Sequence, residues 1–224
     1  MREPTPASII SSISRLTSRL VEVGLADHTQ PPKQEKSGRI TRITTASPVD
    51  ASVLKSVRYS EIYDLMLERR AYNARLLDQA LIQLAYEFHG RVLVRQRLAF
   101  LPSPHLVDFD NDPEIYWGEV PYVDIVGTQA VKVPMRVDYD VRPSVDVGVD
   151  HPAAHLTLGQ YKHCRIPVSA PVTPAVFVDF IVRHFYRSPN TSDVSFDLDL
   201  SRAFRHCDPE VDRESVHLIS PGRR

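Results

Sequence analysis

The stretch that decides the fold class is NARLLDQALIQLAYEFHGRVLVRQRLAF, residues 73–100. Apolar side chains recur there at helical spacing, but from Ile82 to Phe88 they also alternate strictly with Gln83, Ala85 and Glu87, as in a half-buried strand. A helix continued over residues 59–88 is longer than most globular helices, whereas His89-Gly90 is typical of a tight turn. The sequence therefore predicts a β-hairpin at this position.

Upstream of the hairpin, residues 6–24 carry Ile and Leu at spacings of three and four and predict an amphipathic helix. The polar stretch 27–38 contains a Pro-Pro pair and predicts an exposed linker. The β-branched residues 39–45 predict a strand, and residues 59–72 a second helix. We therefore divide the chain into a helix with a linker, residues 1–38, and a single α+β domain, residues 39–224.

Downstream, strands are predicted at residues 115–127, 131–141 and 154–161, with edge strands at 195–200 and 215–219. Thr173-Pro174 opens a helix near 174–187, with Thr173 as the N-cap. Its expected buried stripe is Val176, Phe177, Phe180, Ile181, His184 and Phe185. The expected fold is α+β: a curved, mainly antiparallel sheet with an N-terminal helical part and the helix near 174–187 packed on the sheet.

Composition excludes several classes of protein. The 224 residues hold 27 Lys and Arg against 28 Asp and Glu, so net charge points to no particular partner. With 8 glycines and neither a Walker A nor a dinucleotide fingerprint, the common nucleotide-loop enzymes are not expected. Two cysteines are too few for a disulfide framework, and neither a signal peptide nor a membrane span is evident. We expect a cytoplasmic protein with no membrane partner.

Charge is nevertheless segregated along the chain. Residues 106–150 hold ten acidic and three basic side chains, whereas residues 151–187 hold four basic, one acidic and four histidine side chains. If the strand at 135–141 pairs near the strand at 154–161, an acidic surface faces a basic one across a cleft. Such an arrangement perturbs pKa values.

Candidate catalytic residues lie on these two strands. Arg136, Asp138 and Asp140 share one strand face, so two carboxylates flank one site. They can hold a divalent ion or act as acid and base, and the alternative is a solvated face on which Arg136 pairs with one carboxylate. The metal therefore stays undetermined.

His155 and Thr157 share a face in HLTLG, the His-apolar-Thr-apolar form of phosphoesterases that pair two such motifs. The nearest second copy, residues 216–220, places its hydroxyl one residue too late. Four histidines in this region (151, 155, 163 and 184) suggest a metal site, but their spacing does not support one. His184 is expected to be a core histidine. Cys164 is expected to be a buried small side chain.

Basic side chains offer phosphate contacts. Arg91, Arg95 and Arg97 alternate on one strand, where a solvated face is the simpler interpretation. Lys162 and Arg165 follow the HLTLG motif, and Tyr161 or Trp117 can stack on a base. The candidate substrate-binding residues are Arg136, Thr157, Gln160, Tyr161, Lys162 and Arg165.

Three stretches carry a family resemblance: RLAFLPSP (97–104), VPMRVDYDV (133–141) and HPAAHLTLGQYKHCRIPVSAPVTPAVFVDFIVRHFY (151–186). In this order they resemble a bacterial family known as domain of unknown function 2290, over residues 55–190. The resemblance implies an intracellular bacterial protein and assigns no catalytic residue. The order of an Arg-Tyr-Asp strand and clustered histidines is also similar to toxins of toxin and antitoxin pairs.

Two hypotheses for function follow. The first is a small enzyme acting on nucleic acid or nucleotide phosphodiesters, as a toxin or phage-defence component. In it Asp138 or Asp140 orients a base or metal, His155 transfers a proton, and Thr157, Lys162 and Arg165 hold phosphate. The alternative is a noncatalytic interaction or structural module, with a protein partner encoded in the same operon, whose polar strand residues form an ion-pair network.

Overall fold

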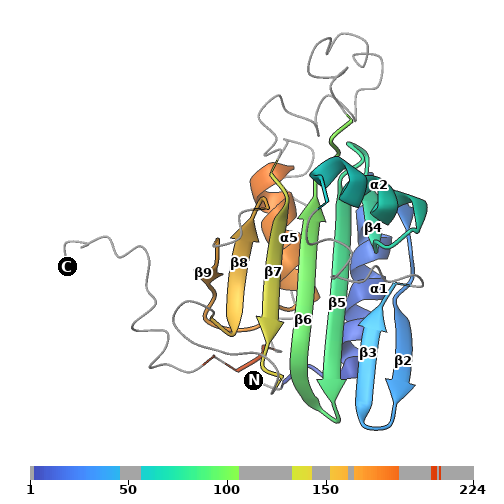
Figure 1. Ribbon diagram of the computed structural model, residues 1–224. Coiled ribbons are helices and arrows are strands. Elements are labelled where there is room, and N and C mark those ends of the chain that lie inside the picture. The colour runs from blue at the N-terminus through green and yellow to red at the C-terminus, as the bar shows by residue number, and fades with distance from the viewer. Residues whose placement is uncertain are drawn as a thin grey trace, which may run out of the picture.

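The computed structural model describes residues 3–45, 57–105, 133–142, 152–160, 164–186, 203–205 and 207. Within these residues the chain forms three helices and one open antiparallel sheet of nine strands. Helices α1 and α5 lie together behind the sheet in the view of Figure 1, and α2 lies near its upper end. The predicted α+β fold is therefore confirmed.

The central hairpin joins β5 (Leu81–His89) and β6 (Val92–Leu101), which pair antiparallel. Gly90 adopts a φ of 66° in the two-residue turn, a conformation that favours glycine. The even-numbered residues of β5 from Ile82 to Phe88 face the main core and are buried. The strand interpretation of this stretch is confirmed, because its period of two matches the side of the sheet that the helices cover.

The prediction of an exposed linker at residues 27–38 is wrong. Here β1 (Ala26–Thr29) pairs with β4 (Ala74–Leu76), and β2 (Lys33–Ser37) pairs with β3 (Ile40–Thr44). Both β4 and β3 pair with β5, so residues 26–37 follow one edge of the sheet. Exposed charged side chains and proline are the composition of edge strands, which this sequence shares with linkers.

On the other side of the hairpin the sheet continues through β7 (Met135–Asp140), β8 (Ala154–Leu158) and the short β9 (Ile166–Pro167). Strands were predicted at the positions of β7 and β8. The predicted strands at 115–127, 195–200 and 215–219 lie outside the described residues.

Helix α1 (Pro6–Glu22) begins with a capping box, in which Thr5 and Ser8 each bond to the other's backbone N–H. Gly24, with a φ of 69°, follows its C-terminal end. The buried side of the helix, Ile9, Ile13, Leu16 and Leu20, belongs to the main core cluster. The predicted helix at 6–24 is confirmed.

Helix α5 (Pro174–Phe185) begins at its predicted N-cap, where the Thr173 hydroxyl accepts a hydrogen bond from Val176 N–H. The predicted buried stripe is only partly right. Val176, Phe180 and His184 are exposed, and the His184 ring lies 4.8 Å from that of Phe180. The buried residues are Pro174, Ala175, Phe177, Val178, Ile181 and Val182. Because the helix itself carries apolar residues on more than one side, the sequence does not determine which side faces the core.

Helix α2 (Tyr59–Glu68) is shorter than predicted, because Arg70 adopts a φ of 52° and Ala71 N–H bonds back to the Met66 carbonyl. Tyr63 and Met66 pack on Leu81 in a second, smaller cluster. Leu81 alternates with the core residue Ile82, so α2 covers one end of the sheet face opposite to α1 and α5.

Candidate charged face

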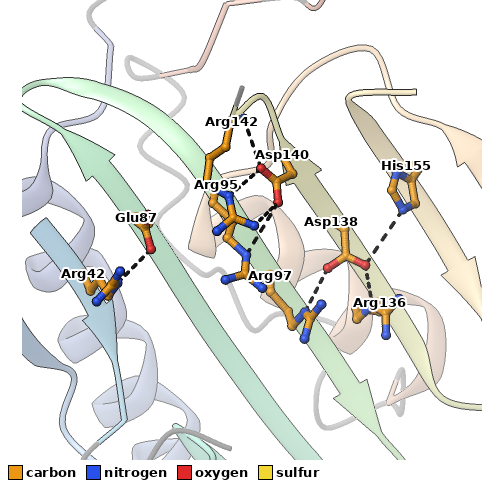
Figure 2. Close-up of polar contacts among 9 residues, drawn as sticks. All are labelled: Arg42, Glu87, Arg95, Arg97, Arg136, Asp138, Asp140, Arg142 and His155. Carbon is orange, nitrogen blue, oxygen red and sulfur yellow. Dashed lines mark hydrogen bonds and ion pairs between the residues drawn. The ribbon is translucent and has the colours of Figure 1, made fainter. Parts of the chain in front are cut away.

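The candidate site is a set of charged side chains on the sheet face opposite to α1 and α5 (Figure 2). We call it the charged face; it comprises Arg42, Glu87, Arg95, Arg97, Arg136, Asp138, Asp140, Arg142 and His155. Strand register brings these residues together, since Asp138 on β7 lies opposite Arg97 on β6 and opposite His155 on β8. Alternation along β7 places Arg136, Asp138 and Asp140 on one side, as predicted.

Asp138 is held between two guanidinium groups. Its Oδ1 accepts a hydrogen bond from Arg97 Nε at 3.0 Å, and its Oδ2 accepts one from Arg136 Nε. Burial by itself raises the pKa of Asp138, but the charges and hydrogen bonds of Arg97 and Arg136 outweigh it, so the pKa lies below its usual value. Asp138 is therefore a stable carboxylate at neutral pH and a poor proton donor.

His155 is buried beside Asp138, and both of its ring nitrogens face protein groups. Nδ1 lies 2.9 Å from the Pro152 carbonyl oxygen, and Nε2 lies 3.9 Å from Asp138 Oδ2. A carbonyl accepts only from a protonated nitrogen, so the Pro152 contact places a proton on Nδ1. This geometry orients the ring against the sheet and favours a positioning role over proton transfer to a substrate.

Asp140 forms the centre of a second group of ion pairs. Arg142 binds it through two hydrogen bonds, Nε to Oδ1 at 2.9 Å and Nη2 to Oδ2 at 2.6 Å, and Arg95 Nε lies 3.8 Å from Oδ2. Burial opposes ionisation, but the hydrogen bonds and charge of Arg142, with that of Arg95, keep the pKa of Asp140 below its usual value. Farther along the sheet, Arg42 Nε on β3 bonds to Glu87 Oε2 on β5 at 2.8 Å.

The carboxylates of the charged face lie deeper than the arginines. The side chains of Glu87, Asp138 and Asp140 are 10%, 12% and 22% exposed. Those of Arg42, Arg136, Arg142, Arg95 and Arg97 are 50%, 42%, 35%, 34% and 24% exposed. Five arginines, three carboxylates and His155 make up the face, and the arginine side chains are more exposed than the carboxylates. Such a surface attracts anions.

The other predicted binding residues divide into three groups. Thr157 lies opposite Arg136 in the β7–β8 pair and is buried, and Arg165 directly precedes β9, whose Pro167 pairs with His155. Gln160 lies beyond the end of β8, where its side chain bonds to the Val57 carbonyl. The candidates Tyr161 and Lys162 lie outside the described residues, as do His151, His163 and Trp117.

Sequence reasoning did not find Arg42, Glu87 and Arg142, and it treated Arg95 and Arg97 mainly as a solvated face. A strand alternation of Arg42 with buried Thr41 and Ile43 was a visible signal. The partners were not visible, because pairing Arg42 with Glu87 requires the register between strands 45 residues apart. The segregated charges predicted an acidic surface that faces a basic one. In the described residues, Asp138 and Asp140 face arginines of β6, and most of the acidic stretch 106–150 lies outside these residues.

Cys164 is partly buried, and its sulfur accepts a hydrogen bond from Leu158 N–H at 3.4 Å. Across the described ranges, no three His, Cys, Asp or Glu side chains group closely enough to hold a metal ion. Among the same residues, no helix is long and apolar enough to span a membrane.

Comparison with known proteins gives one family. The model of a family described as uncharacterized conserved protein (DUF2290) matches residues 25–219, which include every strand of the sheet. Neither the curated proteins nor the solved structures contain a significant match to the chain.

Proposed function

The chain belongs to the family of uncharacterized conserved proteins DUF2290, and for this member we propose that the charged face binds the phosphate groups of nucleic acid or nucleotides. The observation that carries the proposal is the difference in depth between the more exposed arginine side chains and the more buried carboxylates. Guanidinium groups match phosphate oxygens in geometry as well as charge.

In this proposal Arg97 and Arg136 are the central phosphate contacts and Asp138 is their positioning residue. Each arginine bonds to Asp138 through Nε, and a guanidinium has five N–H donors, so its terminal amino groups can bind a phosphate. A fixed guanidinium loses less conformational entropy on binding than a mobile one. Thr157 on β8 lies opposite Arg136, so it extends this set of contacts onto the neighbouring strand.

Hydrolysis of a phosphodiester, with His155 as the proton-transfer residue, is the competing proposal. It is supported by the closeness of His155, Asp138 and two arginines. It is opposed by the positions of the ring nitrogens, which face Pro152 and Asp138, and by the lowered pKa of Asp138. A purely structural ion-pair network, as in a noncatalytic interaction module, explains the pairing as well, and it predicts no binding of phosphate.

The setting of this activity is also a proposal. The family resemblance supports a bacterial protein, and a chain with only two cysteines, too few for a disulfide framework, is consistent with the cytoplasm. A toxin or phage-defence component that binds nucleic acid, together with a protein encoded in the same operon, fits this setting.

Fluorescence anisotropy with labelled DNA and RNA oligonucleotides and a labelled nucleoside triphosphate tests the proposal. Arg97→Gln and Arg136→Gln are each expected to weaken binding about tenfold or more, since a charged hydrogen bond contributes roughly 1.5 to 3 kcal/mol. The matched control is Arg183→Gln, which removes one positive charge from the solvent side of α5, on the other side of the sheet. Binding to none of the probes would overturn the proposal.

Asp138→Asn separates positioning from simple electrostatics, because it removes one negative charge from the face, and the amide keeps only one oxygen acceptor for the two arginines. Weaker binding at unchanged melting temperature supports the positioning role, and tighter binding contradicts it. The same samples are examined for cleavage of the oligonucleotide. Cleavage that His155→Gln abolishes would replace binding by hydrolysis as the function.

A further inference from the structure

The strand register arranges charges in a row that crosses the sheet. Arg42 on β3 lies opposite Glu87 on β5, Glu87 opposite Arg95 on β6, and Arg95 opposite Asp140 on β7. Arg142, two residues after the end of β7, bonds to Asp140 and is the last member of the row. Figure 2 shows Arg42 beside Glu87, and Arg95 and Arg142 both beside Asp140.

The row presents its positive members to the solvent. Both carboxylates lie deeper than the three arginines, of which Arg42 at 50% is the most exposed. Arg95 is more enclosed, and burial followed by the charges of Arg97 and Arg142 lowers the pKa of its guanidinium. The part of this lowering that comes from the like charges of Arg97 and Arg142 is opposed by a bound phosphate.

The length of the row exceeds a single phosphate group. From β3 to β7 the chain crosses three strand spacings, or about 14 Å. The row is several times longer than the axial rise per nucleotide of about 3.4 Å, so a ligand that spans it carries more than one phosphate group. A mononucleotide contacts only part of it.

The described strand residues of this face, beyond the part under α2, include no Phe, Tyr or Trp. The uncharged side chains beside the ion pairs are Gln83, Ala85, Ala99 and Thr157. Bases are stacked mainly on aromatic side chains, whereas phosphates are bound by arginine whatever the base. The composition of the face therefore favours recognition of the backbone.

We propose that the ligand is a polynucleotide whose sugar–phosphate backbone runs across the strands, from Arg42 to Arg142, and is bound independently of base sequence. This inference rests on the proposed function and adds the class of ligand and its direction on the sheet. Arg97 lies two residues after Arg95 on β6, and Arg136 lies opposite Ala99 on β7. Both residues flank the row.

The test compares a mononucleotide with an oligonucleotide long enough to span the row, by anisotropy over a series of salt concentrations. Arg42→Gln and Arg142→Gln are each expected to weaken oligonucleotide binding several-fold and to reduce the salt slope by about one. Their effect on the mononucleotide is expected to be smaller. Oligonucleotides of equal length and different sequence are expected to bind within about threefold of one another, well under the roughly tenfold that corresponds to 1.4 kcal/mol.

Two controls keep the result interpretable. Arg19→Gln removes an exposed charge from α1, away from the face, and is expected to leave binding unchanged. Arg42→Lys retains the positive charge beside Glu87 but not the guanidinium group. If this variant is stable, keeps the salt slope and binds more weakly, position 42 acts in binding and not only in folding.

The outcomes separate this inference from the proposed function. If the mononucleotide binds as tightly as the oligonucleotide and the Arg42 and Arg142 variants behave like wild type, the inference fails while phosphate binding stands. If no nucleotide or nucleic acid binds, the proposed function fails as well. If polyglutamate of equal charge competes as strongly as the oligonucleotide, the ligand is an acidic protein and the inference is overturned.

Discussion

Asp138 and Asp78 are both buried carboxylates, and their partners shift their pKa values in opposite directions. Two arginine charges outweigh burial at Asp138. At Asp78, in the turn between β4 and β5, burial dominates over the hydrogen bonds from the Tyr186 hydroxyl, at 2.7 Å, and from Ala80 N–H, so the pKa is raised. The pKa of a buried carboxylate is thus lowered or raised according to the charge of its partners.

We predict that Asp78→Asn makes the protein less sensitive to rising pH. Because the folded pKa of Asp78 is raised, its contribution to stability is full below the unfolded pKa of about 3.9 and is lost as pH rises through the folded pKa. Asparagine keeps an acceptor for Ala80 N–H and cannot ionise. Urea unfolding at several pH values should therefore show the variant gaining stability relative to wild type from pH ~4 toward neutrality, and parallel profiles would contradict this.

Hairpin turns connect residue conformation to the position of the strands. Gly38 links β2 to β3 and Gly90 links β5 to β6, both with positive φ and both followed by arginine. The two turns are adjacent, since Gly90 N–H bonds to the Arg39 carbonyl at 2.8 Å. The register of β3, β5 and β6, and with it the row of charges, begins at these turns.

Gly90→Ala is expected to destabilise the protein by about 1 to 2 kcal/mol. A Cβ at this position meets no atom within 4 Å, so the cost is that of the left-handed backbone conformation alone. Gly90→Asn is the matched control, because asparagine tolerates this conformation better and should cost less. Chemical denaturation measures both variants, and equal losses would show that the strain argument is wrong.

At the scale of the whole molecule, α1 and the sheet share one hydrophobic core. Ile13 on α1, Leu84 on β5 and Ile181 on α5 belong to the same cluster. The N-terminal helix therefore contributes apolar surface that the sheet needs to bury. The charged face lies on the opposite side, where no described helix other than α2 covers the sheet.

A shared core predicts that α1 and the sheet unfold together. Ile13→Ala should lower the free energy of unfolding by about 2 to 5 kcal/mol, because Ile13 is fully buried. The control Val21→Ala, on the same helix but 47% exposed, should cost much less. Coincident transitions by circular dichroism and tyrosine fluorescence are expected, and an earlier, separate loss of helix would favour an independent N-terminal part.

Local patterns gave the right element types where one physical cause dominates. The period of two in β5 and β6, the Thr-Pro start of α5 and the spacing of α1 each predicted its element. The pattern failed where two structures share a composition. Residues 27–38 fit both a linker and an edge strand, and α5 is apolar on more than one side, so His184 was misplaced.

The sequence by itself determined the α+β class, the central hairpin and the side of β7 that carries Arg136, Asp138 and Asp140, because turns and side-chain alternation depend on neighbouring residues. Only the tertiary structure decided that Arg97 and Arg136 hold Asp138, that both nitrogens of His155 face the protein, and that the arginines lie outside the carboxylates. These features depend on strand register and burial, which join residues distant in the sequence.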